Sequence, residues 1–178
     1  MYKSALVFTL TTMFGVLAAV STVRAADESK LSSKDAKFLR NAAAGGVMEI
    51  ELGKVAADRG ADADVKKFGQ KMVDDHTKIN ADLKTLAQSK GLDLQKALDD
   101  AAKKSKTEVE DISNYKGAQF DRAYLNMMVK DHEKDVKEFE EASKKAEDSD
   151  VKAFAAKTLT TLQEHLDTAK ATRGKLAK

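Results

Sequence analysis

The hydrophobic and polar positions along the chain predict four long amphipathic helices. Apolar residues recur at three- and four-residue spacing within each, and capping residues mark the ends. The first is predicted from Ser32 or Ser33, with Asp35 placed for a capping box, to about Asp58. The others are predicted from Asp62 to near Gly91, from about Gly117 to a polar turn at 147–149, and from Asp148 or Asp150 to about Ala169. Each helix has one apolar stripe, so we expect the four to bury these stripes against one another in a bundle.

The connections between these helices are unequal in length. Helices one and two, and likewise three and four, are joined by a few residues and must be antiparallel neighbours. About 25 residues separate helix two from helix three, and this charged segment predicts a short helix plus a turn. It is long enough to run the length of a bundle of roughly 40 Å. A ferritin-like crossover and a plain up-and-down order are both compatible with it.

The chain also contains an internal similarity. The sequence DVKKFGQK at 64–71 matches DVKAFAAK at 150–157, so the starts of helices two and four correspond. Duplication of a helical hairpin would produce this match, and so would convergence of two capped helix starts. The sequence leaves both explanations open.

The first 25 residues have the parts of a secretory signal peptide. Lys3 supplies a charged start, residues 5–20 an apolar run, and residues 23–25 (Val-Arg-Ala) a small-x-small cleavage site. The apolar run is shorter than the roughly 20 residues of a spanning helix, which argues against a retained membrane anchor. We therefore expect cleavage after Ala25 and a single domain over residues 26–178 without a membrane span. The expected location is the periplasm or the exterior, and association with the outer membrane is compatible with it.

Charge and composition exclude several classes of function. Removing residues 1–25 takes away Lys3 and Arg24, so 31 Lys and Arg become 29 against 29 Asp and Glu. A mature chain of near-zero charge gives no argument for nucleic acid as a partner. The chain has no cysteine, which rules out disulfides and thiol chemistry, and it has no proline. We find no glycine-rich phosphate loop and no nucleophile beside a base.

All three histidines of the chain fall on inward stripes. Two of them occur in a repeated pattern, MVDDHTK at 72–78 and MVKDHEK at 128–134. His76 follows Met72 by four residues, His132 follows Met128 by four, and His165 follows Leu162 by three. Counted at the rise of a helix, the three histidines lie in the middle third of the bundle in either topology.

Helix one adds a carboxylate at the same level. Its predicted stripe contains Glu49, whereas Glu51 lies off it; the apolar members are Phe38, Ala42, Gly45, Leu52 and Ala56. Each of the four helices therefore brings one ligand-capable side chain to a common depth. Without partners, a buried carboxylate and three buried imidazoles would cost several kcal/mol, so some interaction must satisfy them.

Two arrangements would meet this requirement. One is a metal site of Glu49, His76, His132 and His165, a donor set that suits zinc, iron, manganese or copper without choosing among them. The other is a metal-free network of His–Glu hydrogen bonds that fixes the helix register. Residues 73, 129 and 162, three before the histidines, are apolar, which disfavours the Glu-x-x-His di-iron pattern. The repeated Met-x-x-x-His would fit copper, but a methionine on an inward-facing stripe more often fills space in the hydrophobic core.

Three further acids accompany these residues. Asp75 and Asp131 directly precede histidines and therefore project to a different face, where lysines or neighbouring helices can pair with them. Asp121 lies near the start of helix three, where it can cap or accept a hydrogen bond from another helix.

Four segments carry a family resemblance. FLRNAAAGGVMEIELGKVAADRG, VKKFGQKMVDDHTKINADLKTLA, FDRAYLNMMVKDHEKDVKEFE and LTTLQEHL together resemble the bacterial domain-of-unknown-function family 4142, over about residues 35–170. The resemblance implies an exported, all-α, ferritin-like antiparallel four-helix bundle with a long connection between helices two and three. Proteins of this family are often labelled as outer-membrane proteins, and no biochemical activity is established for them. Their recurrent Glu and His positions map to Glu49, His76, His132 and His165. The chain departs from many relatives at Thr160, where they have proline.

These observations lead to three hypotheses of function. The first is a metal-binding or metal-buffering protein, linked to envelope stress, that holds one divalent ion. The second is a non-catalytic structural or interaction bundle of the cell envelope with a buried polar network and no metal. The third, an enzyme, would need an open coordination position that the sequence does not reveal. The sequence identifies neither the oligomeric state nor the protein partner.

Overall fold

The computed structural model describes residues 31–176, and these form five helices and no strand. The helices are α1 (Ser33–Arg59), α2 (Ala63–Ser89), α3 (Gln95–Ser113), α4 (Gly117–Lys145) and α5 (Ser149–Leu176). The predicted signal peptide and its cleavage point lie outside the described residues.

The all-helical prediction is confirmed, but the number of helices differs from it. The segment expected to hold a short helix and a turn is instead the 19-residue helix α3. Its buried positions are only Ala101, Ser105 and Ile112, and charged residues fill most of the remaining positions. The starts of α1, α2 and α5 agree with their predicted caps: the Ser32 hydroxyl accepts from the Asp35 N–H, and Asp62 and Asp148 accept from the first turns of α2 and α5. Helix α4 begins at Gly117, as predicted, without a side-chain cap.

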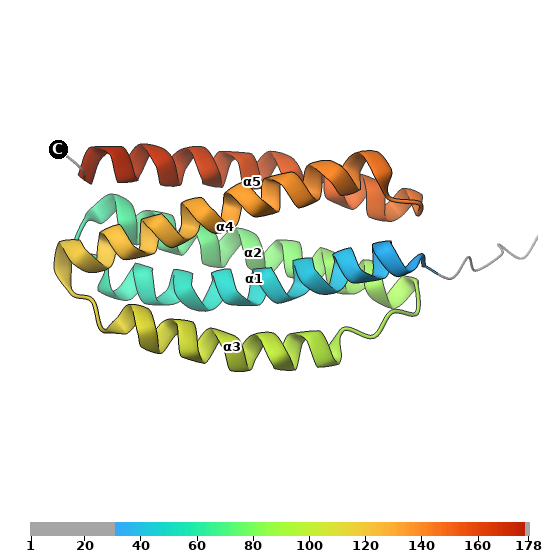
Figure 1. Ribbon diagram of the computed structural model, residues 1–178, viewed down its shortest axis with the longest axis horizontal. Coiled ribbons are helices and arrows are strands. Elements are labelled where there is room, and N and C mark those ends of the chain that lie inside the picture. The colour runs from blue at the N-terminus through green and yellow to red at the C-terminus, as the bar shows by residue number, and fades with distance from the viewer. Residues whose placement is uncertain (1–30, 177–178) are drawn as a thin grey trace, which may run out of the picture.

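The chain runs back and forth along one axis (Figure 1). Helices α1 and α2 form one antiparallel pair and α4 and α5 form another. Helix α3 returns the chain along the outer side of α1, so α4 starts at the end of the bundle where α2 starts. As a result α2 and α4 run in the same direction. Within the described residues, no helix has both the length and the apolar character needed to cross a membrane.

A polar layer divides the hydrophobic core into two clusters. On α2, for example, Val65, Phe68 and Met72 belong to one cluster and Leu83 and Ala87 to the other. The residues between the clusters include one buried polar side chain from each of four helices; these are Glu49, His76, His132 and His165. In the first half of α1, Leu39, Ala43 and Gly46 are buried, one residue after the predicted Phe38, Ala42 and Gly45, which are half-buried. The predicted Leu52 and Ala56 in its second half are fully buried.

Two buried carboxylates join the two helical pairs. Asp121 of α4 accepts hydrogen bonds from the backbone N–H groups of Ala61 and Asp62, at 2.9 and 2.8 Å, in the α1–α2 connection. Asp35 of α1 accepts from the N–H groups of Glu147 and Asp148, at 3.0 and 2.8 Å, in the α4–α5 connection. We call Asp35 and Asp121 the loop-capping carboxylates. The prediction for Asp121 is confirmed, whereas the Asp35 carboxylate caps a distant loop and makes no capping box within its own helix.

Two glycines allow α1 and α2 to approach closely near the polar layer. A β-carbon at Gly53 would lie 2.8 Å from the carbonyl oxygen of Gly69, and one at Gly69 would lie 2.6 Å from the backbone nitrogen of Ala57. Gly53 lies one turn after Glu49, and Gly69 lies two turns before His76. This backbone contact therefore holds the two polar side chains at a short separation.

Candidate metal centre

Four helices each bring one of the predicted residues to the polar layer. Glu49 comes from α1, His76 from α2, His132 from α4 and His165 from α5. Their relative exposures are 3%, 2%, 0% and 0%, so all four side chains are removed from bulk water. Glu51, which the sequence places off the stripe, is half-buried and pairs with Lys54 at 2.7 Å. The structure therefore brings together all four predicted residues.

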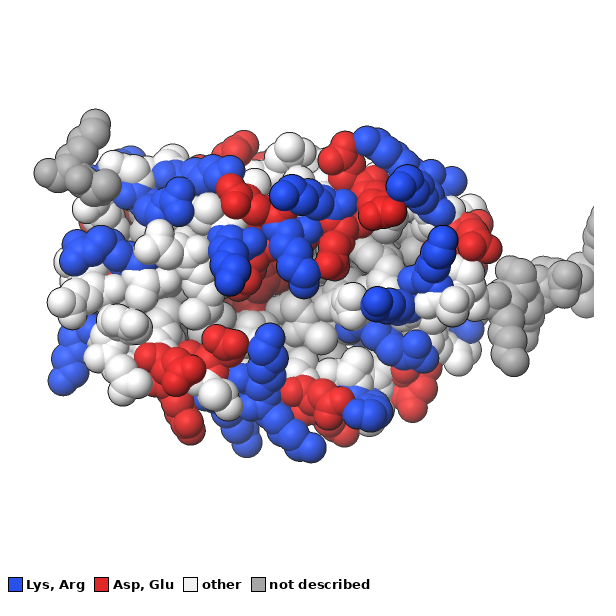
Figure 2. Space-filling view, viewed as in Figure 1, with Lys and Arg blue, Asp and Glu red and all other residues white. Residues whose placement is uncertain are grey.

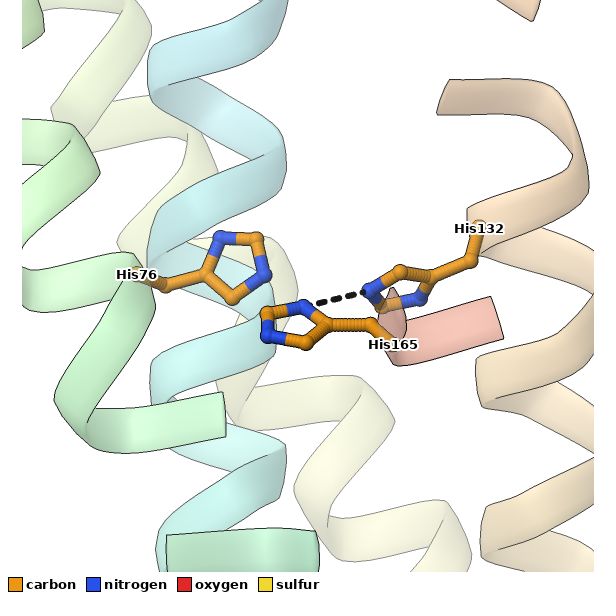
Figure 3. A group of neighbouring side chains, drawn as sticks. All are labelled: His76, His132 and His165. Atoms are coloured by element: carbon orange, nitrogen blue, oxygen red, sulfur yellow. Dashed lines mark hydrogen bonds between the residues drawn. The ribbon is translucent and has the colours of Figure 1, made fainter. Parts of the chain in front are cut away.

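The three imidazoles point toward one another (Figure 3). One ligand-capable nitrogen from each lies within 4.8 Å of those of the other two. His132 Nε2 lies 3.3 Å from His165 Nδ1 and 3.4 Å from Glu49 Oε1. Glu49 Oε2 lies 3.0 Å from His76 Nδ1. Three histidines in this geometry are close enough to hold a metal ion.

The outer hydrogen bonds of two imidazoles fix their tautomers. His132 Nδ1 lies 3.0 Å from the Met128 carbonyl oxygen, which can only accept, so Nδ1 carries the proton. His165 Nε2 lies 2.9 Å from Asp75 Oδ2 and donates to that carboxylate. In the neutral rings, the facing atoms His132 Nε2 and His165 Nδ1 carry no proton, and each presents a lone pair to the other. Two lone pairs 3.3 Å apart repel each other unless a proton or a metal ion lies between them.

Burial keeps the three imidazoles neutral. It lowers the pKa of His132 to about 4, with a further lowering from His165. Burial, then the neighbouring histidines, lowers the pKa of His76 well below its usual value, and burial also lowers the pKa of His165 against the opposing effect of Asp75. Burial raises the pKa of Glu49 well above its usual value, with smaller contributions from two acids of α4, Asp135 and Asp131.

Asp75 supports the cluster from outside. Burial alone would raise its pKa, but hydrogen bonds from Lys71 and His165 outweigh that effect and lower it, so Asp75 is ionised at neutral pH. Lys71 Nζ lies 2.7 Å from Asp75 Oδ2, the oxygen that accepts from His165. A carboxylate that accepts from the outer nitrogen of a histidine is the usual second partner of a metal-binding imidazole. The prediction that Asp75 pairs with a lysine and a neighbouring helix is confirmed.

The methionines of the repeated pattern belong to the core. Met72 and Met128 are fully buried in one hydrophobic cluster. Met128 contributes to the site through its carbonyl oxygen, which accepts from His132. The packing role of these residues is thus sufficient to explain their position.

An open cleft of about 690 Å³ reaches this layer from one side. Its walls come mainly from α1, α3 and α4, and both Glu49 and His76 line it. Half-buried Asp131 and Asp135 of α4 line it as well. Burial raises the pKa of Asp135 to about 7. Asp131 was predicted to pair with a lysine or with a neighbouring helix. Among residues 31–176 no lysine or arginine lies within 4.0 Å of its carboxylate, so the first alternative is not met.

Sequence reasoning missed two features of the structure. It assigned no role to Asp135, and it placed Asp35 in a local cap. A signal for Asp35 was present, because Asp-x-x-Phe-Leu at 35–39 corresponds to Asp-x-x-Tyr-Leu at 121–125. Both aspartates cap the loop of the opposite helical pair, so this correspondence supports hairpin duplication. In the same alignment Asp135 takes the place of Glu49.

We expect the metal-free protein to lose stability on acidification because of His132. Its folded pKa of about 4 lies below the unfolded value of about 6.5, so between these values the unfolded chain binds the additional proton. Stability from this group is present above pH 6.5 and falls by about 3 kcal/mol toward pH 4. Urea unfolding with chelator, followed between pH 7 and 4, should show a shallower pH dependence for His132→Leu. Equal slopes for the two proteins would contradict the assignment.

Comparison with curated proteins and with solved structures gave no match. The family model described as "Domain of unknown function (DUF4142)" matches residues 20–172, which include all four residues of the polar layer. This match covers most of the chain, so the protein belongs to the DUF4142 family.

Proposed function

We propose that this protein binds one first-row transition-metal ion through Glu49, His76, His132 and His165. The observation that carries the proposal is the pair of nitrogen lone pairs, His132 Nε2 and His165 Nδ1, that face each other at 3.3 Å. Among the described residues, His76 Nε2 and Glu49 Oε1 also have no hydrogen-bond partner. A cation at the centre of these groups would satisfy lone pairs that the protein alone leaves unmatched.

The competing metal-free network leaves a buried acceptor, His165 Nδ1, without a donor. Glu49 in its acid form has one proton to donate, either toward His76 Nδ1 at 3.0 Å or toward His132 Nε2 at 3.4 Å. In neither case does His165 Nδ1 have a donor within hydrogen-bond distance. The outer protons of the His132 and His165 rings are used by Met128 and Asp75. His76 Nε2, where the proton of that ring can lie, has no partner among the described residues. A buried acceptor without a donor costs about 1–3 kcal/mol. A metal-free structural network is therefore the weaker candidate. The Glu49–His76 hydrogen bond is the one interaction in the cluster that favours it.

The donor set favours some ions over others. Three imidazole nitrogens and one carboxylate oxygen suit zinc, iron, manganese or copper, and a four-coordinate set of this kind is typical of zinc. Calcium and magnesium prefer oxygen ligands and are poor candidates. Burial raises the pKa of Glu49, so a proton competes with the metal ion for this carboxylate and the affinity should rise with pH.

The arrangement of helices also supports a ferritin-like relationship. The polar residues come from α1, α2, α4 and α5, and α3 makes the end-to-end connection between the two antiparallel pairs. One long crossover of this kind distinguishes ferritin-like bundles from up-and-down bundles. We propose that the chain has this fold, with α3 as an additional helix in the crossover.

The physiological proposal is metal buffering in the cell envelope, with a link to envelope stress. Its support is the N-terminal sequence, which has the three parts of a secretory signal before the helical region. A non-catalytic role agrees with a site in which the protein supplies four ligands, because catalytic sites keep one coordination position open for water or substrate. The cleft that reaches Glu49 and His76 is the feature that would favour an enzyme.

The test uses the mature protein, residues 26–178, stripped with chelator and dialysed against Zn²⁺ or Co²⁺. We expect one ion per chain and, with Co²⁺, the intense visible bands of a four-coordinate site. The ion should also stabilise the fold, by about 4 kcal/mol at a thousand times its dissociation constant. Substoichiometric binding with no change in thermal unfolding would refute the proposal.

A further inference from the structure

The cleft connects the surface to the inner side of the metal centre. It opens between α3 and α4, which make few contacts with each other. Figure 2 shows this face of the molecule, where acidic atoms lie in a hollow and basic side chains, drawn in blue, flank them. Part of its floor is α1 at Ala44, Gly45 and Gly46, whose lack of long side chains leaves the space open.

Charged groups in the cleft are ordered by depth. Lys104, Lys130 and Lys134 are exposed at its rim, whereas Asp131 and Asp135 are half-buried below them. The two aspartates are four residues apart on α4, so their carboxylates lie one turn apart on a single face. Among residues 31–176, neither carboxylate has a lysine or arginine within 4.0 Å. A cation that enters the cleft can therefore bind these carboxylate oxygens without displacing a salt bridge.

The inner end of the cleft is formed by two of the proposed ligands. Glu49 and His76 line it, and both are more than nine-tenths buried. Glu49 Oε1 and His76 Nε2 are the atoms of these side chains that have no hydrogen-bond partner among the described residues. The cleft therefore leads from two half-buried carboxylates to two unpartnered ligand atoms.

The opposite side of the centre is covered. There His165 donates to Asp75, and Lys71 pairs with the same carboxylate. A second, smaller cleft on the α2–α5 side is lined by none of the four proposed ligands. A cation that approached from this side would have to break the Lys71–Asp75 ion pair and the His165 hydrogen bond.

We propose that a hydrated divalent cation reaches the centre through the α3–α4 cleft, with Asp131 and Asp135 as transient ligands on the way. This inference rests on the proposed metal site. A cleft lined by one sign of charge accelerates association of the opposite charge by a factor between about 10 and 1,000. Three lysines at the rim oppose the effect of Asp131 and Asp135 here, so we expect a factor near the lower end. Asp131 and Asp135 thus act on the rate of loading, while Glu49 and the histidines set the equilibrium affinity.

The test is stopped-flow loading of the metal-free mature protein with Co²⁺, together with chelator competition for the equilibrium constant. We expect Asp131→Asn with Asp135→Asn to slow loading by about 10-fold, near the lower bound for such steering, with affinity changed much less. The matched control is Glu140→Gln with Glu141→Gln, which replaces two acidic groups by amides at exposed positions of the same helix. Loading is measured at about pH 8, above the pKa of about 7 of Asp135, so that both variants remove ionised carboxylates. This control should load at the wild-type rate.

A second variant blocks the cleft without a change in charge. A β-carbon at Gly45 would have no heavy atom within 4 Å, so Gly45→Leu fills open space and should leave the fold intact. It should slow loading as the aspartate variant does. If wild-type protein binds Co²⁺ and both cleft variants load as fast as the control, the route is wrong and the metal site stands. If wild-type protein binds no ion, the proposed function fails and the route fails with it.

Discussion

Replacing His76 and His132 together by alanine is expected to abolish stoichiometric metal binding. The variant keeps Glu49 and His165, and two of four donors cannot replace the hydration shell of a transition-metal ion in a buried site. We expect the affinity, measured by competition with a chromophoric chelator, to fall by on the order of a thousandfold or more. Zn²⁺ should also cease to raise the unfolding temperature of the variant, since stabilisation follows binding.

The matched control for this experiment is Met72→Leu. Met72 is fully buried on α2, one turn before His76, and substitution by leucine nearly conserves its volume. The control should bind Zn²⁺ as wild type does. A selective loss of Cu(I) binding in this control would assign a ligand role to the thioether. Equal metal content in wild type and in the double histidine variant, both shown to be folded by circular dichroism, would eliminate the metal site.

The second large effect is expected at the loop-capping carboxylates. Replacing Asp35 and Asp121 together by alanine removes the acceptors of four backbone N–H groups, two in each short connection. Loss of a capping acceptor costs about 0.5–2 kcal/mol, and buried unsatisfied donors cost about 1–3 kcal/mol. We expect the free energy of unfolding, measured with urea, to fall by about 2–5 kcal/mol in total.

Asparagine variants provide the control, because the two carboxylates use their oxygens differently. Both N–H groups of the α4–α5 connection donate to one oxygen of Asp35, whereas Asp121 accepts one hydrogen bond on each oxygen. Asparagine has one acceptor oxygen, so Asp35→Asn should retain both bonds and Asp121→Asn should lose one. A loss of stability that is equal for the two asparagine variants would argue against this account.

Capping chemistry made the starts of α1, α2 and α5 predictable, whereas α4 has no side-chain cap and was predicted from its apolar spacing. Ser32, Asp62 and Asp148 accept from the first turns of their helices, and a hydrogen bond to a first-turn N–H is a local interaction. The length of helix α3 was underestimated because charged residues dominate its sequence and only three of its residues are buried. Its length follows from contact with α1, which no local pattern records.

The residues of the candidate centre were predictable from the sequence, but the orientation of their side chains was not. Helical spacing alone places Glu49, His76, His132 and His165 on inward faces at a common depth, because rise and turn per residue are fixed in a helix. Spacing does not give the rotation of each ring. The facing lone pairs of His132 and His165 depend on acceptors from Met128 and from Asp75 of another helix, and these appear only when the helices are packed.

The sequence by itself determined the helical periodicity, the local caps and the four polar side chains at one level, since each depends on residues within a few turns of one another. Only the tertiary structure decided which nitrogens face inward, which loops Asp35 and Asp121 cap, and that a cleft lined by Asp131 and Asp135 reaches Glu49. These features join residues far apart in the chain, and their geometry depends on how closely the helices approach. At Gly53 and Gly69 that approach is set by backbone contact between α1 and α2.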